Sequence, residues 1–132
     1  MKRLLLIVLP LLLIVGCSKP INEETLVEKD GLMYNPDTKE LYSGKVFKNH
    51  MGGEKEFEGS YKDGKKDGLW ITWFENGLSN FKYFTYYRNG KKEQEQLYKD
   101  EKLSFTIGWY ENGKIKSQGK KWTPKTGQWV KL

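Results

Sequence analysis

The sequence has few of the residues that build covalent cross-links or metal sites. Its 132 residues include one cysteine, Cys17, and one histidine, His50. A lone cysteine cannot form a disulfide within the chain, and protein zinc sites take most of their ligands from clustered cysteine and histidine. We therefore expect no disulfide framework, no metal site and no bound cofactor.

Helical patterning is also scarce. After residue 17 no stretch repeats apolar residues at the 3.6-residue spacing of an amphipathic helix, and the one long apolar run is residues 4–15. That run is about a third shorter than a membrane-spanning helix, and it follows Lys2 and Arg3 as the apolar region of a secretory signal peptide follows its basic region. We expect a signal peptide, and the alternative is an uncleaved membrane anchor.

The apolar run ends at Ile14-Val15-Gly16-Cys17, which resembles the lipidation site of bacterial lipoproteins. The resemblance implies that residues 1–16 are a cleaved signal peptide and that Cys17 carries fatty acyl chains such as palmitate. The alternative for Cys17 is an inert buried thiol. Residues 17–24 would then be the lipidated N-terminus and a tether, and residues 25–132 the folded domain. Because residues 18–24 reach at most about 25 Å when extended, the domain would lie close to the membrane.

The location of the protein limits its partners. Ser18, rather than aspartate, follows Cys17. This resembles sorting to the outer membrane in a cell with two membranes; with one membrane, the anchor would lie on its outer face. Removing Lys2 and Arg3 from the 23 basic residues leaves 21 against 17 acidic residues, a net charge of +4. So mild a balance, together with export, argues against a nucleic-acid binder.

Turn signals recur at short intervals after residue 25. Asn-Gly and Asp-Gly favour the positive-φ turns that join antiparallel strands, and the segments between them are rich in β-branched and aromatic residues. We predict turns at residues 30–31, 35–37, 49–53, 63–64, 67–68, 76–77, 89–90, 100–101, 112–113 and 124–127. The pattern predicts an all-β antiparallel meander.

Two of the predicted strands differ in how their apolar residues are distributed. Residues 104–110 alternate cleanly, with Phe105, Ile107 and Trp109 on one face, so only one face is expected to be buried. Residues 78–87 carry aromatic residues on both faces, including Tyr83 on one and Phe84 on the other. That strand must be covered on both sides or leave aromatic rings at the surface.

An internal repeat runs through the same region. Two aromatic residues, any residue and Asn-Gly recur at 73–77, 86–90 and 109–113. These segments, with Tyr61-Lys62-Asp63-Gly64, resemble the bacterial variant of MORN repeats, and residues 26–46 are similar to the opening of exported proteins named YwqK-like antitoxins. The resemblance implies one elongated sheet of hairpin repeats, capped by residues 18–48 and 120–132, with an antitoxin or immunity-like role. Residues 91–103 depart from the repeat, because Asp100-Glu101 replaces Asn-Gly.

Motifs for catalysis are weak. Residues 59–66 and 108–115 fit seven positions of a phosphate-binding loop, but each lacks the final Ser or Thr and lies between predicted strands instead of before a helix. Paired carboxylates could still form in space from a set of glutamates at 54, 56, 58, 75 and 111. We predict no enzymatic activity and rank an envelope hydrolase third among the functions considered.

Aromatic and basic residues are the candidates for binding. Six lysines and no acidic residue occur in residues 114–132, where they could contact an anionic partner or protect edge strands from aggregation. The candidate binding residues are Trp70, Trp73, Tyr86, Trp109, Tyr110, Lys114, Lys116, Lys120 and Lys121; a core role is the alternative for the aromatic ones. We expect an envelope-anchored interaction module that binds a protein partner or an envelope component. The second hypothesis is a carbohydrate- or peptidoglycan-binding module.

Overall fold

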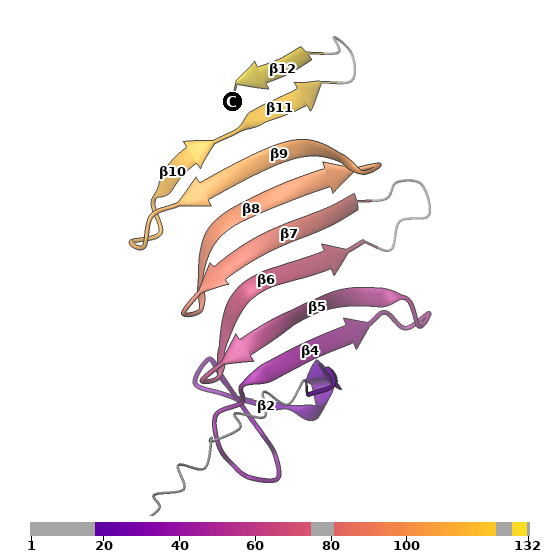
Figure 1. The fold of residues 1–132 in the computed structure, drawn as a ribbon, viewed down its shortest axis with the longest axis vertical. Helices are drawn as coiled ribbons and strands as arrows, with labels where there is room; N and C mark the ends of the chain where they lie inside the picture. The colour runs from indigo at the N-terminus through magenta and orange to yellow at the C-terminus, as the bar shows by residue number, and fades with distance from the viewer. Residues whose placement is uncertain (1–17, 75–80, 124–127, 132) are drawn as a thin grey trace, which may run out of the picture.

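The fold is an elongated β-sheet with a small cap at its N-terminal end (Figure 1). It was analysed in a computed structural model that describes residues 18–74, 81–123 and 128–131, with residues 120–123 and 128–131 described by their backbone only. None of the helices in this described part is long and apolar enough to cross a membrane. The predicted turns at 76–77 and 124–127 lie outside the described residues, as does Cys17.

Eight strands form the main sheet in the order β1-β4-β5-β6-β7-β8-β9-β10. From β4 to β10 each strand pairs antiparallel with the next one in sequence, which confirms the all-β meander. The strands are β1 (Ile21–Asn22), β4 (Gly44–Asn49), β5 (Lys55–Lys62), β6 (Lys65–Trp73), β7 (Phe81–Arg88), β8 (Lys91–Lys99), β9 (Lys102–Trp109) and β10 (Ile115–Gln118).

The remaining elements depart from the prediction of one antiparallel sheet. Strand β1 pairs parallel with β4. Two hairpins form sheets of their own: β2 (Val27–Lys29) with β3 (Leu32–Tyr34), and β11 (Lys120–Thr123) with β12 (Gln128–Lys131). A short 3-10 helix, η1 (Glu23–Thr25), joins β1 to β2. Part of the segment expected to be a tether therefore belongs to the fold, because Ile21 and Asn22 add to the edge of β4.

Most of the predicted turns are where the sequence placed them. Asp30-Gly31, Asp63-Gly64 and Asn89-Gly90 each have positive φ at both residues, as two-residue type I′ hairpin turns require. The degenerate Asp100-Glu101 has the same geometry, with φ of 48° and 63°. The hairpin pattern therefore continues through this unit without glycine.

The predicted turn at Asp67-Gly68 is wrong. Both residues lie inside β6, and Gly68 pairs with Tyr87 of β7. The pairing of β5 with β6 shifts register between Glu58 and Ser60, and Gly68 has a φ of 72°. An Asp-Gly pair favours positive φ, which a β-bulge uses as readily as a turn.

The core lies under the cap, where Leu26, between η1 and β2, and Met33 of β3 pack on one face of β4, β5 and β6. Its buried members are Leu26, Val46, Tyr61 and Trp70. The indole of Trp70 lies against Gly59, where an added Cβ would be 2.2 Å from the ring, and its Nε1 donates a hydrogen bond to the Ser60 carbonyl at 3.1 Å. Of residues 18–48, predicted to cap this end, β1 and β4 are strands of the main sheet, and η1, β2 and β3 lie outside it. At the other end, the backbone of β11 and β12 continues beyond β9 (Figure 1).

Beyond the cap the sheet is a single layer. Residues that pair directly share a face, so Tyr83 lies with Thr72 and Leu97, while Phe84 lies with Ile71 and Gln96. This confirms that β7 has aromatic residues on both faces. Tyr83 and Phe84 are both half-buried, because neighbouring side chains on the same face cover them and no second layer of structure does.

Candidate functional site

The structure divides the predicted binding residues into four groups. Trp70 is a core residue, 3% exposed, so it is withdrawn from the candidate surface. Lys66 packs over it, with Nζ 4.3 Å from the ring centroid, and burial lowers the pKa of that lysine. Lys120 and Lys121 lie in β11, where only the backbone is described.

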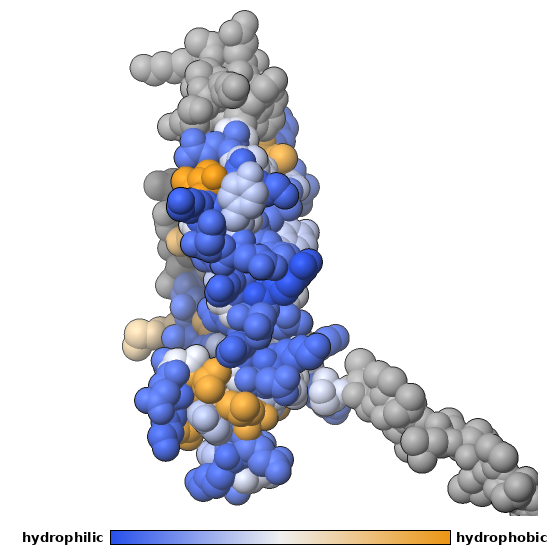
Figure 2. Space-filling model, turned by 90° about the vertical axis from the view of Figure 1, so that its left-hand side faces the viewer, coloured by the Kyte–Doolittle hydropathy of each residue, from blue (hydrophilic) through white to orange (hydrophobic). Residues whose placement is uncertain are grey.

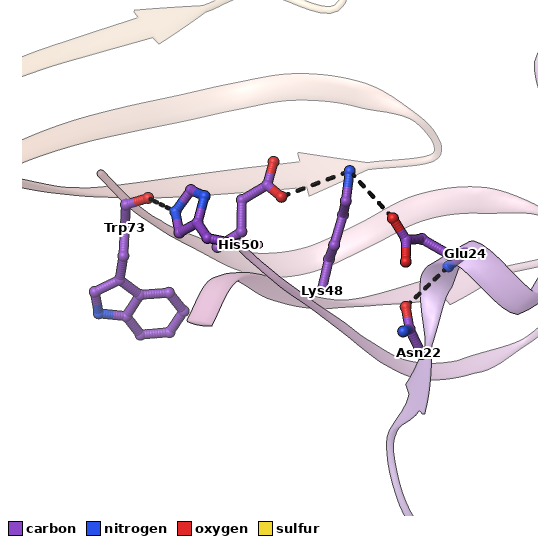
Figure 3. Close-up of polar contacts among 6 residues, drawn as sticks. Asn22, Glu24, Lys48, His50 and Trp73 are labelled. Atoms are coloured by element: carbon purple, nitrogen blue, oxygen red, sulfur yellow. Dashed lines mark hydrogen bonds and ion pairs between the residues drawn. The ribbon is translucent and has the colours of Figure 1, made fainter. Parts of the chain in front are cut away.

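Trp73 lies apart from the other candidates, at the end of β6 near the β4–β5 loop. His50 of that loop contacts the Trp73 carbonyl through Nε2 at 3.3 Å (Figure 3), and Lys55 places Nζ 5.4 Å from its ring centroid. These two contacts connect the β4–β5 region to the end of β6. Figure 3 also shows Lys48 between η1 and β5, where it pairs with Glu24 at 3.7 Å and Glu56 at 3.5 Å.

The other candidates come together at the opposite end of the sheet. In a meander, successive hairpin turns alternate between the two sides of the sheet at which the strands end. The β7–β8 and β9–β10 turns therefore lie on the same side (Figure 1). Tyr86, Trp109, Tyr110 and Lys116 lie there with three cations that the sequence did not single out, Arg88, Lys91 and Lys92. They do not all share a face: Tyr86 is in register with Gln94 and Gly108, so the next residue, Trp109, points to the opposite face. These seven residues are called the basic–aromatic end. Lys114 lies in the adjacent β9–β10 turn and is exposed.

The rings of the basic–aromatic end are accessible and lie beside cations. Tyr110 is 52% exposed and Tyr86 38% exposed. Lys116 has its Nζ 5.9 Å from the Tyr110 ring centroid, and Lys92 has its Nζ 5.8 Å from that of Trp109. Such an arrangement suits a ligand that offers both an anionic group and an apolar or planar surface.

The cations differ in how far they are already neutralised. Arg88 pairs with Glu93 at 2.9 Å, and Lys92 pairs with Glu95 at 2.7 Å. Burial acts to lower the pKa of Lys92, but the hydrogen bond and charge of Glu95 outweigh it and raise that pKa. Within the described part of the chain, Lys91 and Lys116 have no ion pair; Lys91 Nζ donates to the Glu111 carbonyl at 3.1 Å. Lys91 and Lys116 are therefore the cations most available to a ligand.

Three shallow grooves lie against Trp109, and one of them, of about 430 Å³, follows the β9–β10 turn beside Lys91 and Lys92. The other two differ in their lining. One, of about 440 Å³, is lined by Tyr86, Gln94, Thr106 and Lys116 among others. The second, of about 240 Å³, lies against Arg88, Lys91, Lys92 and Tyr110. Ligand-binding clefts usually exceed about 300 Å³, so the groove beside Tyr86 could take a side chain or a sugar ring.

Sequence reasoning missed Arg88, Lys91 and Lys92, although a signal was present. They flank the Asn89-Gly90 turn, and the meander places that turn beside the next one on the same side of the sheet. Counting strands from the Asn-Gly turns would have brought the basic segment 88–92 next to Trp109 and Tyr110. The strand pairing carries this information, while the lysine count of the C-terminus does not.

The described residues offer little to a catalytic or metal-dependent mechanism. They contain no group of three or more His, Cys, Asp or Glu that could hold a metal ion. Glu56 and Glu58 pair with lysines of β4 and β5. Glu111 follows β9, which is four strands away from β5, or about 19 Å at ordinary strand spacing. Glu75 lies outside the described residues. Both segments that fit part of a phosphate loop are hairpins, and a helix follows neither.

No protein-family model matches the chain, and neither the curated proteins nor the solved structures gave a match. The resemblance to MORN repeats therefore stays a prediction from the sequence.

Proposed function

We propose that this protein is a non-enzymatic interaction module of MORN type, lipid-anchored to the cell envelope through Cys17. The basic–aromatic end binds an acidic, partly apolar surface of a partner protein. The module then has an antitoxin or immunity-like role. The observation that carries the proposal is that Tyr86, Trp109, Tyr110 and Lys116 lie with three further cations around the turns on one side of the sheet. Exposed rings next to cations are typical of interface hot spots.

The position of this surface supports an outward-facing role. The segment that follows Cys17 enters the sheet at β1, and the basic–aromatic end lies toward the far end of the sheet (Figure 1). A module held near the membrane at one end would thus present its binding residues away from it. A partner arriving from outside the cell, or an envelope protein, could reach that end.

Pull-down of the lipidated protein from detergent-solubilised envelopes tests the proposal. Lys116→Glu places an acidic group beside Tyr110 and should reduce recovery of a stoichiometric partner by about tenfold, since each lost contact of roughly 1.4 kcal/mol has that effect. The matched control is Lys29→Glu, which makes the same charge change at an exposed position in β2. Equal recovery with both variants, or no stoichiometric partner with the wild type, would reject a protein-binding role.

The second candidate function is binding of a carbohydrate polymer such as peptidoglycan. Exposed Tyr110 and the groove beside Trp109 favour it, because sugar rings stack on aromatic faces. Sedimentation with purified sacculi separates the two functions. The Tyr86→Ala, Tyr110→Ala double variant is the informative one, because Trp70 is in the core and its removal would disturb the fold instead.

A further inference from the structure

A second groove lies at the cap end of the sheet, on the face that the cap leaves bare. It has a volume of about 740 Å³, within the usual range for ligand sites. Phe47, Leu69 and Ile71 make up the apolar part of its lining, and polar residues line it as well, among them Lys45, Lys55, Glu58 and Ser60. Leu69 is 40% exposed, an unusual position for a leucine in the middle of a sheet.

The groove and the core occupy opposite faces of the same strands. Side chains of successive strand residues point to opposite faces: Val46 is buried in the core under the cap, and Phe47 lines the groove. Phe47 pairs with Glu58, and Glu58 pairs with Ile71, so these three side chains lie in a row on the groove face. Figure 2 views the molecule from the side of the β5–β6 and β7–β8 turns; hydrophobic residues gather there at the cap end, while the surface above is mainly hydrophilic.

Lys19 and Pro20 are the only lining residues that come from outside strands β4, β5 and β6 among the described residues. The chain then passes through the plane of the sheet as β1, at the edge of β4, and continues into η1 and the cap on the other face. The chain therefore enters the fold from the groove side. Cys17 is two residues before Lys19, and two residues of chain span at most about 7 Å, so a group attached to Cys17 can reach the rim of the groove.

We infer that this groove holds an acyl chain carried by Cys17, and this inference rests on the lipid anchor of the proposed function. An acyl chain is long, flexible and apolar, so it would lie along Phe47, Leu69 and Ile71, while Glu58, between Phe47 and Ile71, stays paired with Lys55. Lys45 and Lys55 can lay their methylene stems along the chain and keep their ammonium groups in water. Lys55 is already paired with Glu58 at 2.5 Å, so the rim favours an uncharged chain over a free anionic amphiphile.

Occupancy by its own acyl chain has two consequences for the protein. The chain would cover Leu69 and Ile71, the apolar residues that the cap leaves bare. It would also hold the cap end of the sheet at the membrane surface, because the remaining acyl chains stay in the bilayer. The lipid would then set the orientation of the sheet as well as its location.

The test uses cells grown with a fatty acid that carries a photoreactive diazirine, so that the full lipoprotein acquires labelled acyl chains. After irradiation, mass spectrometry of the purified protein locates adducts between the lipid and its own polypeptide. The inference predicts adducts on peptides that contain Phe47, Leu69 or Ile71. Leu69→Lys should reduce these adducts by about tenfold or more, because it places a charge in the apolar part of the lining. The control, Val27→Lys, makes the same change at a 50% exposed position on β2.

The outcomes separate the inference from the function on which it depends. Labelled protein whose adducts lie only on other lipids or proteins would overturn the groove assignment and leave the anchor intact. Protein that acquires no label at all would overturn both. The map of wild-type adducts decides the matter by itself if Leu69→Lys fails to fold, which resistance to trypsin would reveal.

Discussion

Glu101 occupies a backbone position that the other tight turns of the sheet give to glycine. Its φ is 63°, and that of Asp100 is 48°. A side chain in the left-handed region costs about 1 kcal/mol relative to glycine. We therefore expect Glu101→Gly to raise the free energy of unfolding by about 0.5–1 kcal/mol, measured from the urea midpoint.

The control for this turn is Glu101→Ala, which keeps a Cβ and so keeps the strain. It should leave the midpoint near that of the wild type. A midpoint that falls with Glu101→Gly would show that the Glu101 side chain stabilises the turn by more than its conformation costs.

The contact of Gly59 with Trp70 gives a second prediction at the level of single residues. Because a Cβ at position 59 would lie 2.2 Å from the indole, Gly59→Ala should lower the free energy of unfolding by about 2 kcal/mol. In a Trp70→Leu background the same change should cost less than about 1 kcal/mol, since the smaller side chain leaves room. Additive costs in this double-mutant cycle would mean that Gly59 is required for another reason.

Gly108→Ala is the matched control for that cycle. An added Cβ there would lie 2.8 Å from the Ser117 Oγ, and a serine hydroxyl can rotate away, so a smaller loss is expected. Chemical denaturation with urea measures all four variants under the same conditions.

The burial of Trp70 illustrates what sequence could not decide about single residues. Trp70 and Trp73 share a strand and have similar neighbours in sequence, yet one is in the core and the other lies near a loop. They are three residues apart in one strand and so lie on opposite faces, and Gly59 leaves space for the Trp70 ring on the face that the cap covers. Periodicity places a side chain on a face, but the cap decides which face is covered.

At the scale of elements, a part-buried hydrogen bond joins the cap to the sheet. The Tyr61 hydroxyl donates a hydrogen bond to Glu23 Oε1 of η1 at 2.5 Å. Burial, and then the hydrogen bond to Glu23, raise the pKa of Tyr61 well above its usual value. The folded protein therefore keeps this proton at pH values where the unfolded chain loses it.

The pH dependence follows from the direction of that shift. A raised pKa contributes stability that is fully present below the usual tyrosine pKa of about 10 and is lost as the pH rises above it. Tyr61→Phe should lower the stability near pH 7 by about 1 kcal/mol, through loss of the hydrogen bond. Between pH 9 and pH 12 the free energy of unfolding of this variant should then fall less steeply than that of the wild type. The two slopes should differ by roughly the contribution of one titrating tyrosine.

Urea unfolding at several alkaline pH values measures both slopes. Tyr42 and Tyr87, whose pKa values burial also raises, contribute the same slope to both proteins, so only the difference is informative. Parallel curves would show that Tyr61 keeps its proton equally well in the unfolded chain, against the geometry of the cap.

The elements that sequence predicted best are those with strong local chemistry. Asn-Gly and Asp-Gly defined the hairpin turns because two successive positive φ values admit few other residues. The pairing of β1 was missed because two residues between Pro20 and Glu23 carry no periodic signal, and their partner in β4 is more than 20 positions away. The bulge at Gly68 was missed because an Asp-Gly pair has the same backbone preference in a bulge and in a turn.

At the scale of the whole molecule, the sheet works as a one-dimensional array. Each strand from β5 to β9 pairs only with its neighbours in sequence, so the cap end and the basic–aromatic end are connected through consecutive strand pairs and no direct contact. A surface variant at one end should therefore leave the other unchanged. The proposed anchor and the proposed binding surface, at opposite ends of the sheet, can therefore act independently.

The surface charges at the basic–aromatic end predict a dependence on salt. Lys91 and Lys116 are exposed, and interactions between exposed charges are screened within about 8–10 Å at physiological salt. Binding of an acidic partner should weaken by severalfold between about 0.1 M and 0.5 M salt. The salt dependence should be smaller for Lys116→Glu than for Lys29→Glu, and an unchanged affinity in all three proteins would exclude these cations from the interface.

The most direct test of the central claim is site-specific photocrosslinking in intact cells. A photoreactive phenylalanine analogue is placed at Tyr110, in the basic–aromatic end, or at Val27, which has nearly the same exposure on the cap. The claim predicts one discrete adduct of defined mass from position 110 and none from position 27. No adduct at position 110, or the same adducts from both positions, would contradict it.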